Sequence, residues 1–137
     1  MERLDLIYRG AAAFGGATIA YLFGGWSALL GILLAFVVLD YLTGLMAAAI
    51  KGELSSTVGA RGIAKKICVF AMVAVAHLVD VALGDASIVR DATIFFYLAN
   101  ELISIIENSG RIGIPVPDPI QKAVLVLKRK SGGGINA

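Results

Sequence analysis

Residues 26–50 read WSALLGILLAFVVLDYLTGLMAAAI, and Asp40 is the only charged residue in this stretch. About 20 apolar residues are enough to cross the hydrocarbon core of a bilayer as a helix. The stretch therefore predicts a membrane-spanning helix. A carboxylate near the middle of such a helix costs about 2.5–3.5 kcal/mol. We therefore expect Asp40 either to contact a polar group of a neighbouring helix or to face water.

The composition of the whole chain agrees with lipid as its solvent. Of the 137 residues, 58% are hydrophobic and 16% are charged, whereas a soluble domain usually has about 25% charged residues. A chain this short buries only a modest core in water. The composition therefore predicts an all-α integral membrane bundle, with the lipid bilayer as a partner. The net charge of +2 gives no support to a nucleic-acid partner.

Three further apolar segments resemble membrane spans, at about residues 7–23, 63–83 and 88–106. The first is short and rich in glycine and alanine, and we interpret it as a retained span rather than a cleaved signal peptide. Four spans with both termini in the cytoplasm place eleven of the twelve basic residues inside, as the preference of lysine and arginine for the cytoplasmic side requires. Only Arg90 then lies outside, in the loop that also holds Asp85 and Asp91. Three spans would put the N-terminus outside, so we expect four.

The cytoplasmic basic residues are concentrated at two places. The connection after residue 50 is expected to hold Lys51, Arg61, Lys65 and Lys66. The second place is the tail, residues 115–137, which we separate from a transmembrane domain at residues 1–114. These positions predict a multi-pass membrane protein with both termini in the cytoplasm.

The tail is expected to form a short amphipathic helix. Proline ends a helix, and Pro115, Pro117 and Pro119 follow the last span; Asp118 then caps the new helix. Its apolar face is made of Ile120, Ala123, Val124 and Leu127, and its membrane-surface basic residues are Lys122, Lys128, Arg129 and Lys130. Two placements remain open: on an anionic inner leaflet, or packed under the bundle.

Catalytic and metal-binding patterns are absent from the sequence. His77 is the only histidine and Cys68 the only cysteine, so neither a metal site nor a nucleophile–base set can be assembled from them alone. We expect no cofactor, no metal and no enzymatic activity. His77 and Asp80 lie close to the outer end of their span, where they are expected to form a polar cap.

Small residues at intervals of four form three candidate packing faces. Such faces let helix backbones approach closely in lipid. The three rows are Gly16, Ala20 and Gly24; Gly31 and Ala35; and Gly44, Ala48 and Gly52. The rows predict helix packing, either within one chain or between copies.

The last span carries polar side chains at intervals of three or four residues, which places them in one stripe. The stripe consists of Thr93, Tyr97, Asn100, Glu101, Ser104, Glu107, Asn108 and Arg111. A helix that is polar along one side does not lie alone in lipid. The stripe therefore meets polar groups within the bundle, lines water between several copies, or lies at the membrane interface. Pairing of Lys65 or Lys66 with Glu101 or Glu107 is one possibility within the bundle.

Several short motifs occur together in a recognisable order. They are DYLTG at 40–44, KGELSS at 51–56, RGIAKK at 61–66, YLANELISIIEN at 97–108 and GIPVP at 113–117. Over residues 10–128 the chain resembles the toxin-secretion/phage-lysis holin family of Gram-positive phages, prophages and clostridial toxin loci. The family's Asp-x-x-Thr-Gly segment falls on Asp40, Thr43 and Gly44, and its Asn-Glu…Glu-Asn segment on Asn100, Glu101, Glu107 and Asn108.

The resemblance implies a function that composition alone does not. Holins associate in the cytoplasmic membrane as homo-oligomers and open lesions that release a cell-wall hydrolase (endolysin) or a toxin, without catalysis. Asp40, Thr43 and the residues of the polar stripe are then expected either to line a pore or to join helices. Some holins start at a second methionine to make an inhibitor, but here the next methionine is Met46. The alternatives are a small proton-coupled multidrug-type transporter and a non-conducting membrane anchor.

Overall fold

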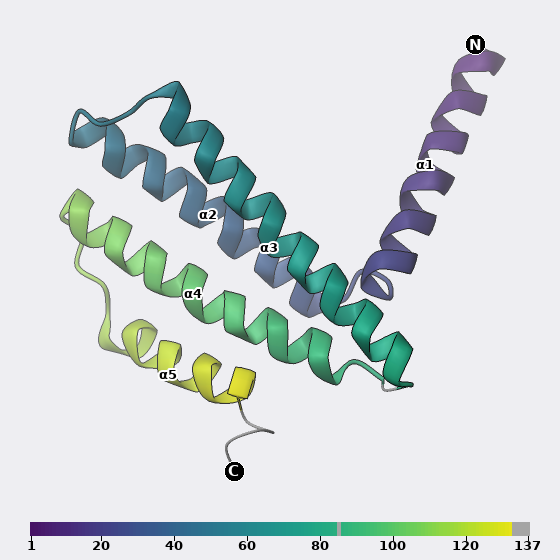
Figure 1. Ribbon diagram of the computed structural model, residues 1–137. Helices are drawn as coiled ribbons and strands as arrows, with labels where there is room; N and C mark the ends of the chain where they lie inside the picture. The colour runs from purple at the N-terminus through teal and green to yellow at the C-terminus, as the bar shows by residue number, and fades with distance from the viewer. Residues whose placement is uncertain (85, 133–137) are drawn as a thin grey trace.

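The computed structural model describes residues 1–84 and 86–132, and these residues form five α-helices and no strand (Figure 1). The helices are α1 (Glu2–Phe23), α2 (Ala28–Ile50), α3 (Ser56–Leu83), α4 (Ile88–Ile112) and α5 (Asp118–Gly132). The prediction of an all-α fold is confirmed. Asp85 and residues 133–137 of the predicted tail lie outside the described residues.

The helix boundaries follow from local capping groups. The side chains of Ser27 and Ser55 accept hydrogen bonds from the backbone N–H of Leu30 and Val58, at 3.2 and 3.1 Å, and so satisfy free donors at the starts of α2 and α3. At the C-terminal end of α1, Gly24 takes a left-handed conformation with φ +73°. Glycine adopts this conformation without steric cost, and it ends the helix.

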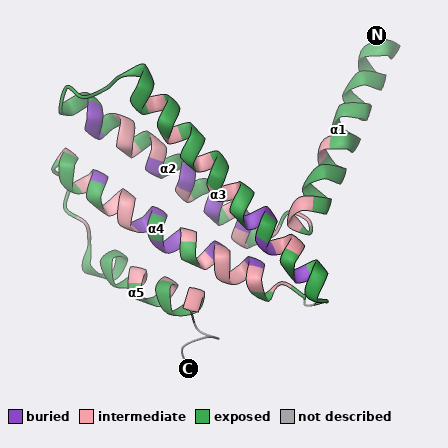
Figure 2. Ribbon diagram, in the orientation of Figure 1, coloured by how far each residue is buried: buried purple, intermediate pink, exposed green. Residues whose placement is uncertain are grey.

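The helices α2, α3 and α4 pack together around one apolar core (Figure 2). The core side chains are Leu30, Leu33 and Val37 from α2, Val73 from α3, and Ile94 and Leu98 from α4. These residues repeat at helical spacing, so each helix presents one apolar stripe to the other two. Burial of these stripes positions α4 against both α2 and α3.

Helix α1 extends away from this bundle (Figure 1). No residue of α1 is buried, and its contacts are with α3 near the end of α1. There Phe23 packs edge-on against Phe70 with ring centroids 6.4 Å apart. The apolar side chains of α1, including Leu6 and Phe14, are therefore exposed.

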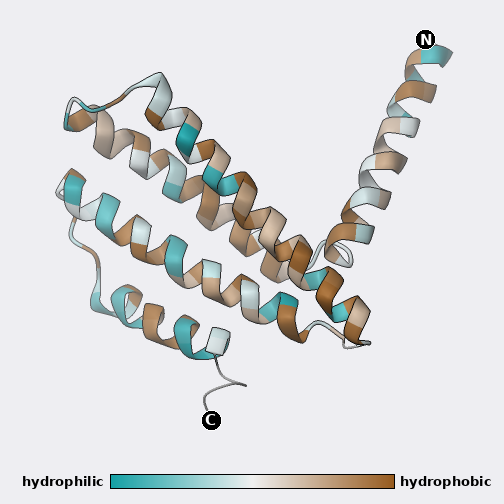
Figure 3. Cartoon of the chain, in the orientation of Figure 1, coloured by the Kyte–Doolittle hydropathy of each residue, from teal (hydrophilic) through white to brown (hydrophobic). Residues whose placement is uncertain are grey.

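Three helices, α1, α2 and α3, are long and apolar enough to cross a membrane. Hydrophobic residues make up most of α2 and of the second half of α3 (Figure 3). Some of them are exposed; Ile67 on α3, for example, is 65% exposed. A helix that is apolar all round belongs in a protein core or in lipid. Helix α4 has 25 residues but carries more charge, and it is not one of these three.

The start of α3 differs from the prediction. Lys65 and Lys66 were expected in a connecting loop, but α3 begins at Ser56, so both residues lie inside the helix. The prediction was wrong because Ser55 caps a helix that begins at Ser56, seven residues before the apolar segment begins at residue 63. As a result, Lys66 lies on the helix beside α2 and α4 rather than in the loop.

Helix α5 folds back along α4 (Figure 1). It begins at Asp118 itself, and the backbone N–H of Gln121 donates to the Pro117 carbonyl, 3.3 Å away. Leu127 packs against the core. Of the two placements left open by the sequence, the structure has the helix packed under the bundle.

Candidate functional site

Three charged side chains from three different helices meet inside the bundle. Lys66 of α3 donates hydrogen bonds to the Asp40 carboxylate of α2 and to Glu101 Oε2 of α4, the latter over 2.6 Å. The exposed fraction of the side chain is 19% for Lys66 and 7% for each carboxylate. We call Asp40, Lys66 and Glu101 the ion cluster. Buried charges are tolerated only when they are paired and hydrogen-bonded, so the ion cluster ties the three helices together.

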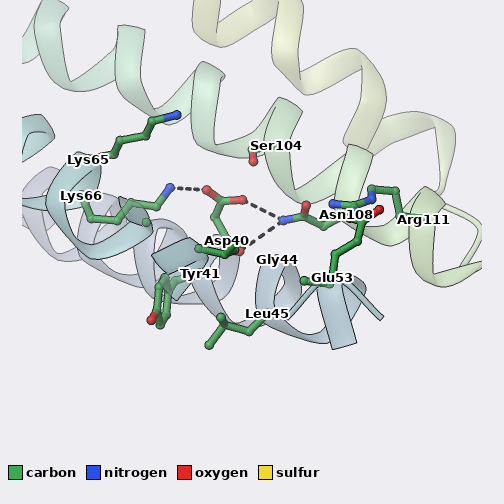
Figure 4. Close-up of a pocket in the computed structure, with 13 residues that line it drawn as sticks. Asp40, Tyr41, Gly44, Leu45, Glu53, Lys65, Lys66, Ser104, Asn108 and Arg111 are labelled. Atoms are coloured by element: carbon green, nitrogen blue, oxygen red, sulfur yellow. Dashed lines mark hydrogen bonds and ion pairs between the residues drawn. The ribbon is translucent and has the colours of Figure 1, made fainter. Parts of the chain in front are cut away.

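Asn108 extends the ion cluster toward the end of α4. Its Nδ2 lies 2.9 Å from Asp40 Oδ1, 3.2 Å from the Asp40 carbonyl oxygen and 3.0 Å from Thr43 Oγ1. Figure 4 shows Asp40 between Lys66 and Asn108. The Asp40 carboxylate thus has polar partners on both sides, Lys66 of α3 and Asn108 of α4.

The charges of the ion cluster do not balance. Two carboxylates share one lysine, so with all three groups ionised the cluster has one negative charge in excess. In an interior of low dielectric constant this excess is unfavourable. The ion cluster therefore joins the helices by good geometry, and its fully ionised form favours contact with water.

An open crevice of about 400 Å³ lies beside the ion cluster, between α2, α3 and α4 (Figure 4). Asp40, Lys66, Ser104 and Asn108 line it together with apolar groups such as Leu45. Polar groups of the ion cluster are thus already at the edge of a space that can hold water.

Tyr41 fills the gap between α2 and α3, a contact that the sequence did not predict. Its hydroxyl donates a hydrogen bond to the Gly59 carbonyl at 3.3 Å. A Cβ at Gly62 would lie 3.0 Å from the Tyr41 ring. The two glycines, three residues apart on one face of α3, were the available signal for this close approach.

The polar stripe of α4 divides between two environments. Glu101 and Asn108 are buried, and Ser104 lies half-buried at the crevice, whereas Asn100 and Glu107 are exposed. Tyr97 packs half-buried against the core. The remaining two members bond locally or at the surface: Thr93 donates to the Val89 carbonyl at 2.7 Å, and Arg111 pairs with Glu53 at 2.8 Å. Only the inward part of the stripe therefore belongs to the site.

The rows of small residues also have different environments. Ala48 is buried, and a Cβ at Gly44 would lie 3.5 Å from Asn108 Nδ2, so this face lets α4 approach α2 closely. Gly52 was expected to continue that row but lies beyond the end of α2, with φ +73°. The faces made of Gly16 with Ala20 and of Gly31 with Ala35 have no α-helix packed over them in the described chain: Gly16 has no heavy atom within 4 Å of its Cβ position, Gly31 meets only Trp26, and Ala20 and Ala35 are exposed.

A second polar cluster lies at the opposite end of the bundle. The fully buried Asp80 accepts hydrogen bonds from the backbone N–H of Val89 and Arg90, at 2.9 and 2.8 Å, and so caps the start of α4. The sequence predicted a polar cap at this end of the span. Arg90 was expected in a loop but lies in the first turn of α4, 9% exposed. Its guanidinium donates to the Phe23 carbonyl at 2.7 Å and so holds the end of α1. Gly24 lies beside His77 there: a Cβ at Gly24 would be 2.6 Å from the imidazole.

The basic residues of the tail lie mostly on the outside. Lys122, Lys128, Arg129 and Lys130 are all exposed, and the Lys130 ammonium lies 5.4 Å from the centre of the Phe95 ring on α4. This last contact is a cation–π interaction. It fixes the end of α5 beside the first half of α4.

Comparison with known proteins gives consistent similarities. An uncharacterized protein of Listeria innocua is 50% identical over 117 residues, which cover 85% of this chain and 84% of that protein. An uncharacterized protein of Halalkalibacterium halodurans is 45% identical over 130 residues, 91% of this chain and 96% of that protein. A protein of Bacillus phage phi105 named as a probable holin is 34% identical over 109 residues, 80% of each chain. No solved structure matches the chain significantly.

The family comparison covers most of the chain, including every residue of the ion cluster. Residues 17–129 match the model of the bacteriophage holin family. The resemblance that the motifs suggested is thereby confirmed, and the chain belongs to the bacteriophage holin family.

Proposed function

We propose that this chain acts as a holin, whose copies associate in the bacterial cytoplasmic membrane and open lesions that release an endolysin or an exported toxin. Membership of the holin family and the similarity to a probable holin of a Bacillus phage support this role. The family also suggests a membrane protein without enzymatic activity.

The observation that carries the proposal is the buried ion cluster at the contact of α2, α3 and α4. While α4 lies against α2 and α3, Asp40, Lys66 and Glu101 satisfy one another. When α4 moves away, each of these charges needs a new polar partner, and water is the partner that meets all of them. The same side chains therefore stabilise a closed bundle and, after rearrangement, line an aqueous lesion.

The length of α4 and the partners of its buried charges also support the four-span topology. The 25 residues of α4 measure about 37 Å at 1.5 Å per residue, enough to cross a bilayer of about 30 Å. Its most buried charges, Arg90 and Glu101, have partners inside the protein. Four spans place both termini in the cytoplasm.

Association between copies is supported by the unpacked small-residue faces. Gly16 and Ala20 lie on a helix with no buried residue, and Gly31 and Ala35 lie on the outside of α2. Small residues let a second helix approach closely in lipid, where hydrophobic burial gives no driving force. We therefore assign these faces to contacts between copies.

The membrane potential supplies a trigger for opening. A charge that moves across the whole potential contributes about 2.3 kcal/mol per 100 mV. Separation of the ion cluster moves Asp40 and Glu101 relative to Lys66, so depolarisation changes the balance between closed and open states. Lesion formation then becomes sensitive to the potential.

Inducible expression in a bacterium tests the proposal. A holin collapses the membrane potential abruptly, and the cells lyse when an endolysin is present. Resistance to toxic cations without lysis would instead identify a multidrug-type transporter. Stable potential with no lysis, at normal accumulation in the membrane, would identify an anchor.

A further inference from the structure

Helix α5 presents one apolar face to α4, while its apolar residues Ile120, Leu125 and Val126 are exposed. Ala123, Val124 and Leu127 are half-buried, with Leu127 packed against the core. Lys122 and Arg129 point to the other side and are exposed. A helix with one apolar and one basic face is also the type that inserts into the surface of an anionic membrane. The face made of Ala123, Val124 and Leu127 cannot pack on α4 and enter the membrane at the same time, so for this face the two partners exclude one another.

The position of Lys130 shows how far α5 reaches along α4. The Lys130 ammonium lies 5.4 Å from the centre of the Phe95 ring. Phe95 precedes the last residue of α4, Ile112, by 17 residues, which is about 25 Å of helix. The basic end of α5 therefore lies well away from the end of α4 at which the two helices are connected.

This reach conflicts with a membrane-spanning α4. If α4 crossed the bilayer with α5 still packed on it, Lys128, Arg129 and Lys130 would lie deep in the hydrocarbon region. Charged side chains are strongly disfavoured there. Because α4 also packs against α2 and α3, a membrane-spanning α4 in this bundle requires the release of α5.

We infer that α5 exchanges partners: its apolar face leaves α4 and enters the surface of an anionic bilayer, and α4 crosses the membrane only in this released state. The inference rests on the proposed function for its setting in the cytoplasmic membrane. Charge selects the lipid: Lys122, Lys128, Arg129 and Lys130 oppose the single carboxylate of Asp118 within α5. Anionic headgroups attract such a segment, and salt weakens the attraction.

The distance between α4 and α5 in vesicles tests the inference. In a Cys68→Ser background, spin labels at Asn100→Cys and Leu125→Cys occupy exposed positions on α4 and α5. The full-length protein is reconstituted in phosphatidylcholine alone or in its mixture with phosphatidylglycerol, and the distance is measured by double electron–electron resonance. We expect the anionic mixture to shift the population to longer distances and high salt to reverse the shift.

Two variants separate the two partners of α5. Phe95→Leu removes the ring under Lys130 without changing α5, so longer distances should appear at a lower fraction of phosphatidylglycerol. Lys128→Glu with Arg129→Glu weakens the attraction to anionic lipid, so the short distance should persist in the mixture. Lys51→Glu with Arg61→Glu makes the same change in net charge outside α5 and should behave as the unaltered protein does.

The result that overturns the inference is a distance that does not depend on phosphatidylglycerol, or a charge control that behaves like the α5 charge variant. The measurement does not require a lesion. If the distance responds to lipid as expected but expression causes no loss of potential, then the proposed holin activity fails while the exchange of α5 stands.

Discussion

Lys66 on α3 and Glu101 on α4 are 35 positions apart in sequence, yet Lys66 Nζ lies 2.6 Å from Glu101 Oε2 inside the bundle. Lys66 also donates to Asp40 on α2, so one ammonium holds two carboxylates and three helices. The closed bundle depends on this ammonium, and the excess negative charge provides a reason for the bundle to open. The first two predictions concern these two properties.

Glu101→Gln should delay the loss of membrane potential after induction. The substitution removes the excess negative charge, and the remaining pair of Asp40 and Lys66 is balanced, so the closed bundle becomes more stable. Glu107→Gln is the matched control, because Glu107 is exposed on the same helix. Time courses with a potential-sensitive dye measure the delay. Equal timing for both variants would show that the ion cluster has no part in opening.

Lys66→Met should destabilise the folded protein by about 3–5 kcal/mol, the usual cost of removing one partner from a buried ion pair. It leaves Asp40 and Glu101 facing each other without a counter-charge. Lys65→Met, at the neighbouring exposed position, should change stability by less than about 1 kcal/mol. Unfolding in detergent, followed by circular dichroism, compares the two. A Lys66 variant as stable as the Lys65 variant contradicts the structural role of the ion cluster.

The sequence predicted the elements whose signal is local. The apolar segment 26–50 predicted the start of α2 to within two residues, and the pattern of the tail predicted an amphipathic helix at the place where α5 lies. Helical spacing also grouped Glu101 with Asn108, but it left open whether Lys65 or Lys66 pairs with Glu101 or Glu107. These inferences needed only the period of the helix.

The remainder depended on how the helices pack against one another. Spacing placed Asn100 and Glu101 in one stripe, but α2 covers only one side of it, so Asn100 is exposed and Glu101 is buried. The count of basic residues placed Lys66 in the connecting loop, although the apolar segment at 63–83 includes it, because a lysine paired with two carboxylates cannot be distinguished from a solvated lysine by residue type. The position of Arg90 was missed for a similar reason: besides pairing with Asp91, it donates to the backbone carbonyl of Phe23, and a backbone partner leaves no trace in the sequence.

Gly62→Ala should be destabilising, whereas Gly44→Ala should be nearly neutral. A Cβ at residue 62 meets the Tyr41 ring at 3.0 Å, closer than ordinary contact, and overpacking of this kind costs about 1–3 kcal/mol. A Cβ at residue 44 lies 3.5 Å from Asn108 Nδ2, an ordinary contact. The midpoint of thermal unfolding in detergent distinguishes the variants. If Gly62→Ala unfolds no earlier than Gly44→Ala, then Tyr41 does not hold α2 and α3 together at this place.

Gly16→Leu should reduce association between copies without changing the fold of one copy. Nothing lies within 4 Å of a Cβ at Gly16, so the larger side chain fits the isolated chain, but it blocks close approach of another helix. Chemical cross-linking in membranes measures association, and helix content serves as the control. Ala13→Leu, at another exposed position of α1, tests whether added bulk alone has this effect. The proposal requires fewer cross-linked species for Gly16→Leu than for Ala13→Leu.

The central claim is that side chains around the ion cluster, shielded in the closed bundle, line water in the lesion. In a Cys68→Ser background, Ser104→Cys places a thiol at the crevice beside the ion cluster. Cells expressing this variant are treated with a membrane-impermeant thiol reagent before and after the membrane potential collapses. The account predicts little labelling before the collapse and rapid labelling after it. Labelling at the same rate in both states, or no labelling after the collapse, would contradict it.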